Sequence, residues 1–333
     1  MIFQKIKNRI KLYRDSWLRK RFIKETYPLC FSNDVILIQD VDKLFMYQYN
    51  NIDFNRYDLI VRYLAIEYMY NKNDFGKSLY EKMQLYRRGK VLTKNDWENF
   101  EKLVKSIEIN NYDYNKPIYI DKNQFLKDGS HRLSVQLYFS NKYIPILMSK
   151  RSFNINYDIN WFKKYFNTDE IKIIENKLNN TIKDKELYFI VFLWSPVSEF
   201  FNDIKKDISK KYIIIEENLY RLDNHLEEFV YDIYSTDDVT KDKIKLKLKK
   251  LSFKNNLVQA IKINIGNPKF RKKLKTNTDI SVVIEELKEF IRNTYKNKID
   301  YHYDNIIHIS DNYNQTKELN KLLEKYKEYK VNV

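Results

Sequence analysis

Apolar positions in the first half of the chain recur with two different spacings. Between residues 57 and 107 they lie three or four residues apart, which is the repeat of an amphipathic helix. Other β-branched and aromatic residues form short continuous runs, which are typical of buried strands. The pattern predicts helices at 57–70, 79–86, 97–107 and 132–139. It predicts strands at 35–38, 117–121 and 144–148, with a turn at 128–129.

The same alternation starts again after a polar, helix-prone stretch at 154–185. Strands are expected at 187–193, 212–215 and 257–265, and a strand or a turn at 305–309. Helices are expected at 197–208, 226–234, 282–295 and 316–326. Strands that alternate with helices favour an α+β or α/β fold. The restart predicts two domains, at 31–153 and 186–333, with 154–185 as a helical connector.

The first thirty residues have a pattern of their own. Apolar side chains repeat with spacings of 3, 4, 3 and 4, at Phe3, Ile6, Ile10, Tyr13 and Trp17. Lysines and arginines fill much of the remaining surface, so 1–30 is expected to form a basic amphipathic helix. Such a helix either lies on an anionic membrane surface, through residues 1–24, or packs on the protein's own core.

Composition narrows the function classes. The 333 residues are 43% hydrophobic, which is too apolar for a disordered chain. A net charge of +16 favours phosphate, anionic lipid or nucleic acid as partners. Four glycines cannot build a dinucleotide fingerprint or a P-loop, and one cysteine excludes a disulfide framework and a Cys-rich zinc site. No secretory signal or bilayer-length apolar run is present, so we expect a cytoplasmic protein, at most peripheral at the inner face of the membrane.

A candidate phosphate-binding loop follows the predicted strand at 117–121. The sequence Asp128-Gly-Ser-His-Arg132 makes the chain turn at Gly129 into the start of a helix, where free backbone N–H groups suit a phosphate. Ser130 and His131 offer further hydrogen bonds, and Arg132 offers a bidentate pair with phosphate oxygens. Asp128 is placed to accept a proton or to hold a cation. A purely structural turn is the alternative interpretation.

This order of elements resembles the ParB/sulfiredoxin superfamily, in which a "P-I-x-V-D" strand precedes a "DGxHR" loop. The resemblance covers roughly residues 34–151. It implies a nucleotide-binding domain in which Gly129, Ser130, His131 and Arg132 hold the phosphates of ATP or another nucleoside triphosphate. It also implies that Asp128 assists catalysis or positions Mg²⁺. The cysteine of sulfiredoxin is Ser130 here, which excludes sulfinic-acid reduction through that residue.

Three polar residues upstream share one helical face. Tyr80, Gln84 and Arg87 are spaced by four and three residues. They are candidates to flank the nucleotide, with Arg87 as a second phosphate clamp, or they form one half-buried helix face. Glu67, in an otherwise apolar stretch, is a weaker candidate for a buried acid.

A second candidate site lies near the C-terminus, in the sequence Asn305-Ile-Ile-His-Ile-Ser-Asp-Asn312. His308 is expected at the end of a strand and beside a helix N-terminus, where it would act as a nucleophile or base on a phosphoryl group. The segment resembles the "N-x-x-H-G-S-D-S" stretch of nucleoside diphosphate kinases. That resemblance implies a ferredoxin-like β-α-β-β-α-β domain over 187–326, a phosphate-facing His308, orienting roles for Asn305 and Ser310, and a phosphate contact from Arg292.

The chain departs from the nucleoside diphosphate kinase pattern at three places. The Lys-Pro of that family is Ser195-Pro196 here, the glycine after the active histidine is Ile309, and the second histidine is missing from 227–234. These differences argue against a phosphohistidine cycle on free nucleotides. The alternative interpretation is a structural histidine in a similar α/β domain.

Taken together, these features predict a nucleotide-dependent phosphotransferase that uses Mg²⁺ and acts on a sugar or a cell-surface polysaccharide precursor. Catalytic roles are expected for Asp128, His131 and His308. Two alternatives stay open. One is a ParB-like DNA-binding or nuclease protein, which the positive charge permits. The other is a non-catalytic nucleotide-binding module.

Overall fold

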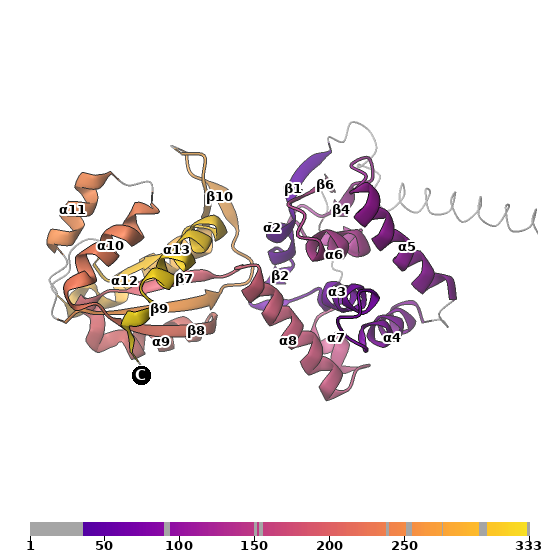
Figure 1. Ribbon diagram of the computed structural model, residues 1–333, viewed down its shortest axis with the longest axis horizontal. Coiled ribbons are helices and arrows are strands. Elements are labelled where there is room, and N and C mark those ends of the chain that lie inside the picture. The colour runs from indigo at the N-terminus through magenta and orange to yellow at the C-terminus, as the bar shows by residue number, and fades with distance from the viewer. Residues whose placement is uncertain are drawn as a thin grey trace, which may run out of the picture. The chain divides into compact units, whose positions relative to one another are not determined.

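A computed structural model describes residues 36–89, 94–149, 152, 156–237, 240–250, 255–274, 276–299 and 305–331. The predicted amphipathic helix at 1–30 lies outside these residues. The described chain contains several sheets and many helices, which confirms the predicted mixed α+β class (Figure 1). It divides into two compact units. Unit 1 comprises the described residues up to Gln48 together with Asn55–Ile174, and unit 2 comprises Tyr49–Phe54 and Glu175–Val333.

Unit 1 is built around a four-stranded sheet with the order β1-β6-β4-β5. Its strands are β1 (Leu37–Asp40), β4 (Ile118–Ile120), β5 (Leu126–Asp128) and β6 (Tyr143–Met148). Strands β4 and β6 are parallel, and the two outer pairings are antiparallel. The helices are α2 (Val41–Met46), α3 (Tyr57–Met69), α4 (Gly76–Arg88), α5 (Lys94–Asn110), α6 (Ser130–Tyr138) and α7 (Ile159–Lys163).

Helix α6 connects the candidate loop to the core of unit 1. It packs against α3, where the Ser134 hydroxyl donates a hydrogen bond of 3.1 Å to the Leu59 carbonyl. Its first residue follows Gly129, which has φ = +98° and lies against β4. A Cβ atom at Gly129 would lie 2.3 Å from Cγ2 of Ile118. Because Gly129 has no side chain, the start of α6 can lie in direct contact with β4.

Unit 2 contains a five-stranded sheet with the order β12-β7-β9-β8-β13, in which every neighbouring pair is antiparallel. Its strands are β7 (Phe189–Leu193), β8 (Ile213–Arg221), β9 (Leu257–Asn264), β12 (Ile307–Ile309) and β13 (Lys330–Val331). A short hairpin, β10 (Phe270–Lys272) and β11 (Asp279–Ser281), follows β9. The α-helices are the second part of α8 (Thr168–Asp184), α9 (Phe201–Ser209), α10 (Leu226–Ser235), α11 (Lys241–Lys250), α12 (Val282–Tyr295) and α13 (Tyr313–Lys325). Short 3₁₀ turns complete the described part of unit 2, at Ser195–Phe200, Asp223–His225, Lys296–Lys298 and Lys327–Tyr329.

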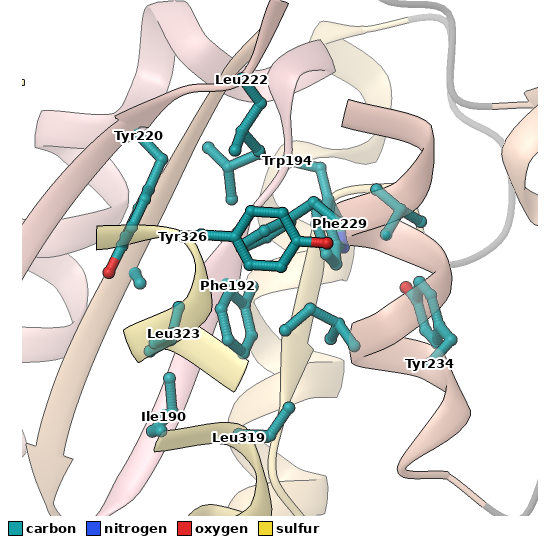
Figure 2. Packing of buried hydrophobic residues seen from close by; sticks show 14 of the residues in the cluster. Ile190, Phe192, Trp194, Tyr220, Leu222, Phe229, Tyr234, Leu319, Leu323 and Tyr326 are labelled. Atoms are coloured by element: carbon teal, nitrogen blue, oxygen red, sulfur yellow. The ribbon is translucent and has the colours of Figure 1, made fainter. Parts of the chain in front are cut away.

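Strand β7 is buried on both faces, and on one of them Phe189 contacts Phe270 of β10 and Tyr313 of α13. Ile190 and Phe192 belong to a core shared with α10 and α13, shown in Figure 2. Phe189 and Val191 are also fully buried, and alternation in a strand points them to the other face. Helices α9 and α12 lie side by side, joined by the hydrogen bond of 2.9 Å from Tyr295 to Asp207. The continuous apolar run that predicted this strand thus reflects burial on two sides.

The hairpin of β2 (Tyr49–Asn50) and β3 (Asp53–Phe54) belongs to unit 2 although the chain on either side of it belongs to unit 1. The Asn264 amide donates to the Tyr49 hydroxyl at 3.2 Å. The predicted connector, 154–185, contains α7 and α8, and the boundary between the units falls within α8. None of the described helices is long and apolar enough to cross a membrane.

The substitution Gly129→Ala should destabilise unit 1 strongly. It places a Cβ atom in a left-handed conformation and against the Ile118 side chain. We expect a loss of about 3 kcal/mol or more in the free energy of unfolding, measured by urea denaturation. Gly89→Ala is the matched control, because Gly89 has φ = +58° but no atom lies within 4 Å of the place that its Cβ would take, so the loss should be about 1 kcal/mol. Equal losses in the two variants would contradict the close contact.

Candidate functional site

A buried carboxylate near the start of α3 holds two arginines. Asp58 accepts hydrogen bonds from Nε and NH2 of Arg56 at 2.7 and 3.0 Å. It also accepts one from NH1 of Arg62 at 2.8 Å, one helical turn further on. All three residues are buried. Burial by itself would raise the pKa of Asp58, but the two guanidinium groups hold that pKa well below its usual range. Asp58 is therefore charged at neutral pH.

A third guanidinium, that of Arg87, adds positive charge that the single negative charge of Asp58 does not balance. Arg87 reaches the site from the last turn of α4 and stacks on the Tyr157 ring, with its Cζ atom 4.5 Å from the ring centroid. Burial and repulsion from Arg87 lower the pKa of Arg62 to about 9. We call Arg56, Arg62 and Arg87 the arginine cluster. Three arginines around one aspartate make an electropositive interior.

Part of the hydrogen-bonding capacity of the arginine cluster is unused. Nε and NH2 of Arg62 and Nε of Arg87 are buried and have no hydrogen-bond partner. The exposed fraction of Arg62 is 0%. Each buried donor left without a partner costs about 1–3 kcal/mol. A bound anion with several acceptor oxygens would satisfy these donors and neutralise the excess charge at the same time.

His131 joins the arginine cluster to the start of α6. Its Nε2 atom lies 2.9 Å from the Tyr80 hydroxyl and 3.1 Å from the Gln84 amide nitrogen. Arg87 donates to the Gln84 carbonyl oxygen at 3.4 Å, which orients the amide so that its nitrogen donates to His131. The imidazole therefore accepts at Nε2 and is neutral. Burial and the nearby charges of Arg62 and Arg87 lower the pKa of His131 well below its usual range.

The structure thus brings together four of the residues predicted from the sequence, namely Tyr80, Gln84, Arg87 and His131. Ser130 is buried in the first turn of α6, directly after Gly129. The backbone N–H groups at the start of this nine-residue helix are oriented as a phosphate requires.

Arg132 and Asp128 contact the segment before β4 and each other. NH1 of Arg132 donates to the carbonyls of Lys116 and Pro117 at 2.5 and 3.0 Å. Its NH2 lies 3.7 Å from the half-exposed Asp128 carboxylate. A phosphate on the Arg132 guanidinium would have to share it with these acceptors. In the free protein this arginine ties α6 to the segment that leads into β4.

Sequence reasoning missed Arg56, Asp58, Arg62 and Tyr157. A signal for two of them exists, because Asp58 and Arg62 are four residues apart and Arg62 interrupts the apolar run from Leu59 to Ile66. Glu67, which we considered as a buried acid, is half-buried. Tyr157 is distant in sequence and reaches the site through a β-bridge with Arg56, so no local pattern identifies it.

The second predicted motif is buried in unit 2 and tied into its framework. The Ser310 hydroxyl accepts from the Ile190 backbone N–H at 3.1 Å and lies 2.9 Å from the Thr316 hydroxyl. Ser310 thereby joins β7 to the start of α13. Asn305, just before β12, is buried at 2% exposure.

His308 and Arg292 both contact groups within unit 2. The His308 Nδ1 atom lies 3.8 Å from the Asp237 carboxylate, and its ring stands edge-on to Tyr234. NH2 of Arg292, on α12, donates to the Ile307 carbonyl at 3.2 Å. These contacts fix β12 between two helical layers, and a phosphate-binding role for His308 remains a prediction.

Comparison with protein-family models, with curated proteins and with solved structures finds no match for this chain.

The neutral state of His131 predicts how stability depends on pH. The unfolded chain takes up a proton on this histidine near pH 6.5, whereas the folded protein does so only at a much lower pH. The free energy of unfolding should therefore fall as the pH drops below about 6.5, by at most about 1.4 kcal/mol per pH unit. His131→Gln removes this titration, so urea denaturation between pH 7 and 5 should show a flatter dependence.

A control variant and the choice of pH window isolate the contribution of His131. His225→Gln removes one half-exposed histidine at the surface and serves as the control for losing a single imidazole. Asp58 loses its contribution only below its unfolded pKa of about 3.8, outside the window tested. A wild-type slope that His131→Gln leaves unchanged would show that His131 is not the neutral group we infer.

Proposed function

We propose that this protein is a nucleotide-dependent phosphotransferase whose unit 1 holds the phosphates of the nucleotide at the arginine cluster. The observation that carries the proposal is the set of unpaired buried donors on Arg62 and Arg87. Planar guanidinium groups match phosphate oxygens in geometry and in charge. The proposed acceptor is a hydroxyl group of a sugar or of a polysaccharide precursor.

The charge balance of the arginine cluster suits phosphoryl transfer. Such reactions depend on positioning the phosphates and on neutralising charge as it builds up on the transferred group. Asp58 already neutralises one arginine charge, so the remaining two are available to the ligand. Because Arg56 and Arg62 are buried and Arg87 is half-buried, each charge acts more strongly on the ligand than it would in water.

The residues next to the cluster have distinct proposed roles. The N–H groups of Ser130 and His131 start α6 and would bind a terminal phosphate. Neutral His131 orders Tyr80 and Gln84 beside Arg87. Asp128 is half-exposed and would receive the proton of the acceptor hydroxyl.

The carboxylates at the arginine cluster do not fit a magnesium ion. Asp58 is fully engaged by two arginines, and the described residues contain no group of three His, Cys, Asp or Glu side chains suited to a metal. Mg²⁺ that enters with a nucleotide needs only one or two protein carboxylates, and Asp128 remains the predicted one. No step of the proposal passes through a metal.

The topology of both units supports the fold resemblances as part of this proposal. In unit 2, β9 lies between β7 and β8, and β7 lies between β9 and β12. A ferredoxin-like domain consists of two β-α-β units, and the two strands of each unit are separated in the sheet by a strand of the other unit. In unit 1 the loop that resembles the ParB/sulfiredoxin superfamily joins β5 to α6, beside β4.

Nucleotide binding to full-length protein tests the proposal. We expect a nucleoside triphosphate at a hundredfold excess over its Kd to stabilise the wild type by about 2.7 kcal/mol, visible as a thermal shift. Arg87→Gln should weaken binding by about tenfold to a hundredfold, because it removes a charge-assisted hydrogen bond to phosphate. The variant should stay folded, because Arg87 lies in the last turn of α4 and is only half-buried.

Arg88→Gln is the matched control, since Arg88 lies next in the same helix and pairs with Asp96 at the surface. It should bind nucleotide as the wild type does. Transfer of a labelled γ-phosphate to an acceptor, or its release as phosphate, then distinguishes a phosphotransferase from a binding module. Absence of any nucleotide-dependent shift in the wild type would overturn the proposal.

A further inference from the structure

Unit 2 contains a cavity of about 330 Å³ beside α13. Side chains from β8, β9 and the edge strand β13, from α8 and α13, and from the segment just before β7 line it, among them Tyr188, Glu216, Tyr220, Lys262, Glu324 and Lys330. Its volume is that of a site for one small molecule. We call it the α13 pocket. All of its lining residues belong to unit 2, whereas the arginine cluster belongs to unit 1.

A buried hydroxyl without a partner lies at the wall of the α13 pocket. The Tyr220 ring is fully buried and packs 5.8 Å from the Phe229 ring. Figure 2 shows its hydroxyl pointing away from Phe229 and Trp194. This hydroxyl has no hydrogen-bond partner in the free protein. Because Tyr220 lines the cavity, a ligand in it is the natural source of the missing partner.

The charges around Tyr220 determine what kind of partner it needs. Burial, together with Glu216 and Glu324, raises the pKa of Tyr220, so the phenol stays protonated and needs an acceptor. Glu216 is already engaged by Lys262 at 2.9 Å and by the Asn218 amide at 2.8 Å. Lys330 is the direct partner of Tyr220 in the pairing of β8 with β13. A hydroxyl donor and an ammonium group on neighbouring strands suit a carboxylate.

A negative charge, opposite to that of Lys330, also lines the α13 pocket. Glu324 lies on α13, and it acts on the Tyr220 hydroxyl electrostatically. Leu323 and the Tyr188 ring supply apolar surface between the polar groups. One small cavity thus contains donors for a carboxylate, an acceptor for an ammonium group and an apolar wall. This combination is complementary to a zwitterion.

We propose that the α13 pocket binds a free amino acid, with its carboxylate on the Tyr220 hydroxyl and Lys330 and its ammonium group facing Glu324. The site would make unit 2 a sensor or substrate site for a small zwitterion, separate from phosphate binding in unit 1.

The test uses the full chain and each of the twenty common amino acids, by thermal shift and then by calorimetric titration. We expect at least one to bind the wild type saturably, and its methyl ester to bind at least tenfold more weakly because the ester has no carboxylate. Tyr220→Phe should weaken binding of the free amino acid by about tenfold or more. The same variant should raise the melting temperature of the free protein, because it removes a buried hydroxyl that has no partner.

Tyr326→Phe is the matched control from the same core. The Tyr326 hydroxyl donates to Asp232 at 2.8 Å, so its loss should lower the melting temperature and leave amino-acid affinity unchanged. The proposal is overturned if none of the twenty amino acids binds the wild type, if the ester binds as tightly as the free acid, or if Tyr220→Phe binds as the wild type does.

Discussion

The interior of unit 1 depends on a single carboxylate. Asp58 holds Arg56 and Arg62 in place, and Arg56 in turn donates to the Leu126 carbonyl of β5. The pair thus joins α3 to the sheet from which the candidate loop emerges. Without Asp58, three guanidinium groups would share one buried region with no counter-charge, and an uncompensated buried charge is among the costliest defects in a protein.

Sequence patterns predicted most of the helices and strands because burial imposes a period on apolar residues. The helix at 57–70, the strand at 187–193 and the helix at 282–295 correspond closely to α3, β7 and α12. Elements such as α2, β2, β3 and β10 have too few residues to show a period. Strand β8 extends to Arg221, beyond the predicted 212–215, because the exposed Glu216 and Glu217 interrupt its apolar pattern.

Only the part of the candidate site that has a local sequence pattern was predictable. Tyr80, Gln84 and Arg87 share a helical face, and the loop around Gly129 has a recognisable composition, so local spacing identified them. Tyr157 becomes significant only through its pairing with Arg56, far away in sequence, and the spacing of Asp58 and Arg62 does not reveal that both are fully buried. Conversely, the sequence predicts that Arg132 pairs with phosphate oxygens, whereas in the structure it donates to two backbone carbonyls that no local pattern indicates.

The hairpin at Tyr49–Phe54 has a consequence for how the chain acquires its structure. Tyr49 bonds to Asn264, 215 residues further along, while the segments that flank the hairpin belong to unit 1. During synthesis this hairpin must wait for most of the protein to emerge before its own partner exists. No single break in the backbone can therefore separate the two units with both complete.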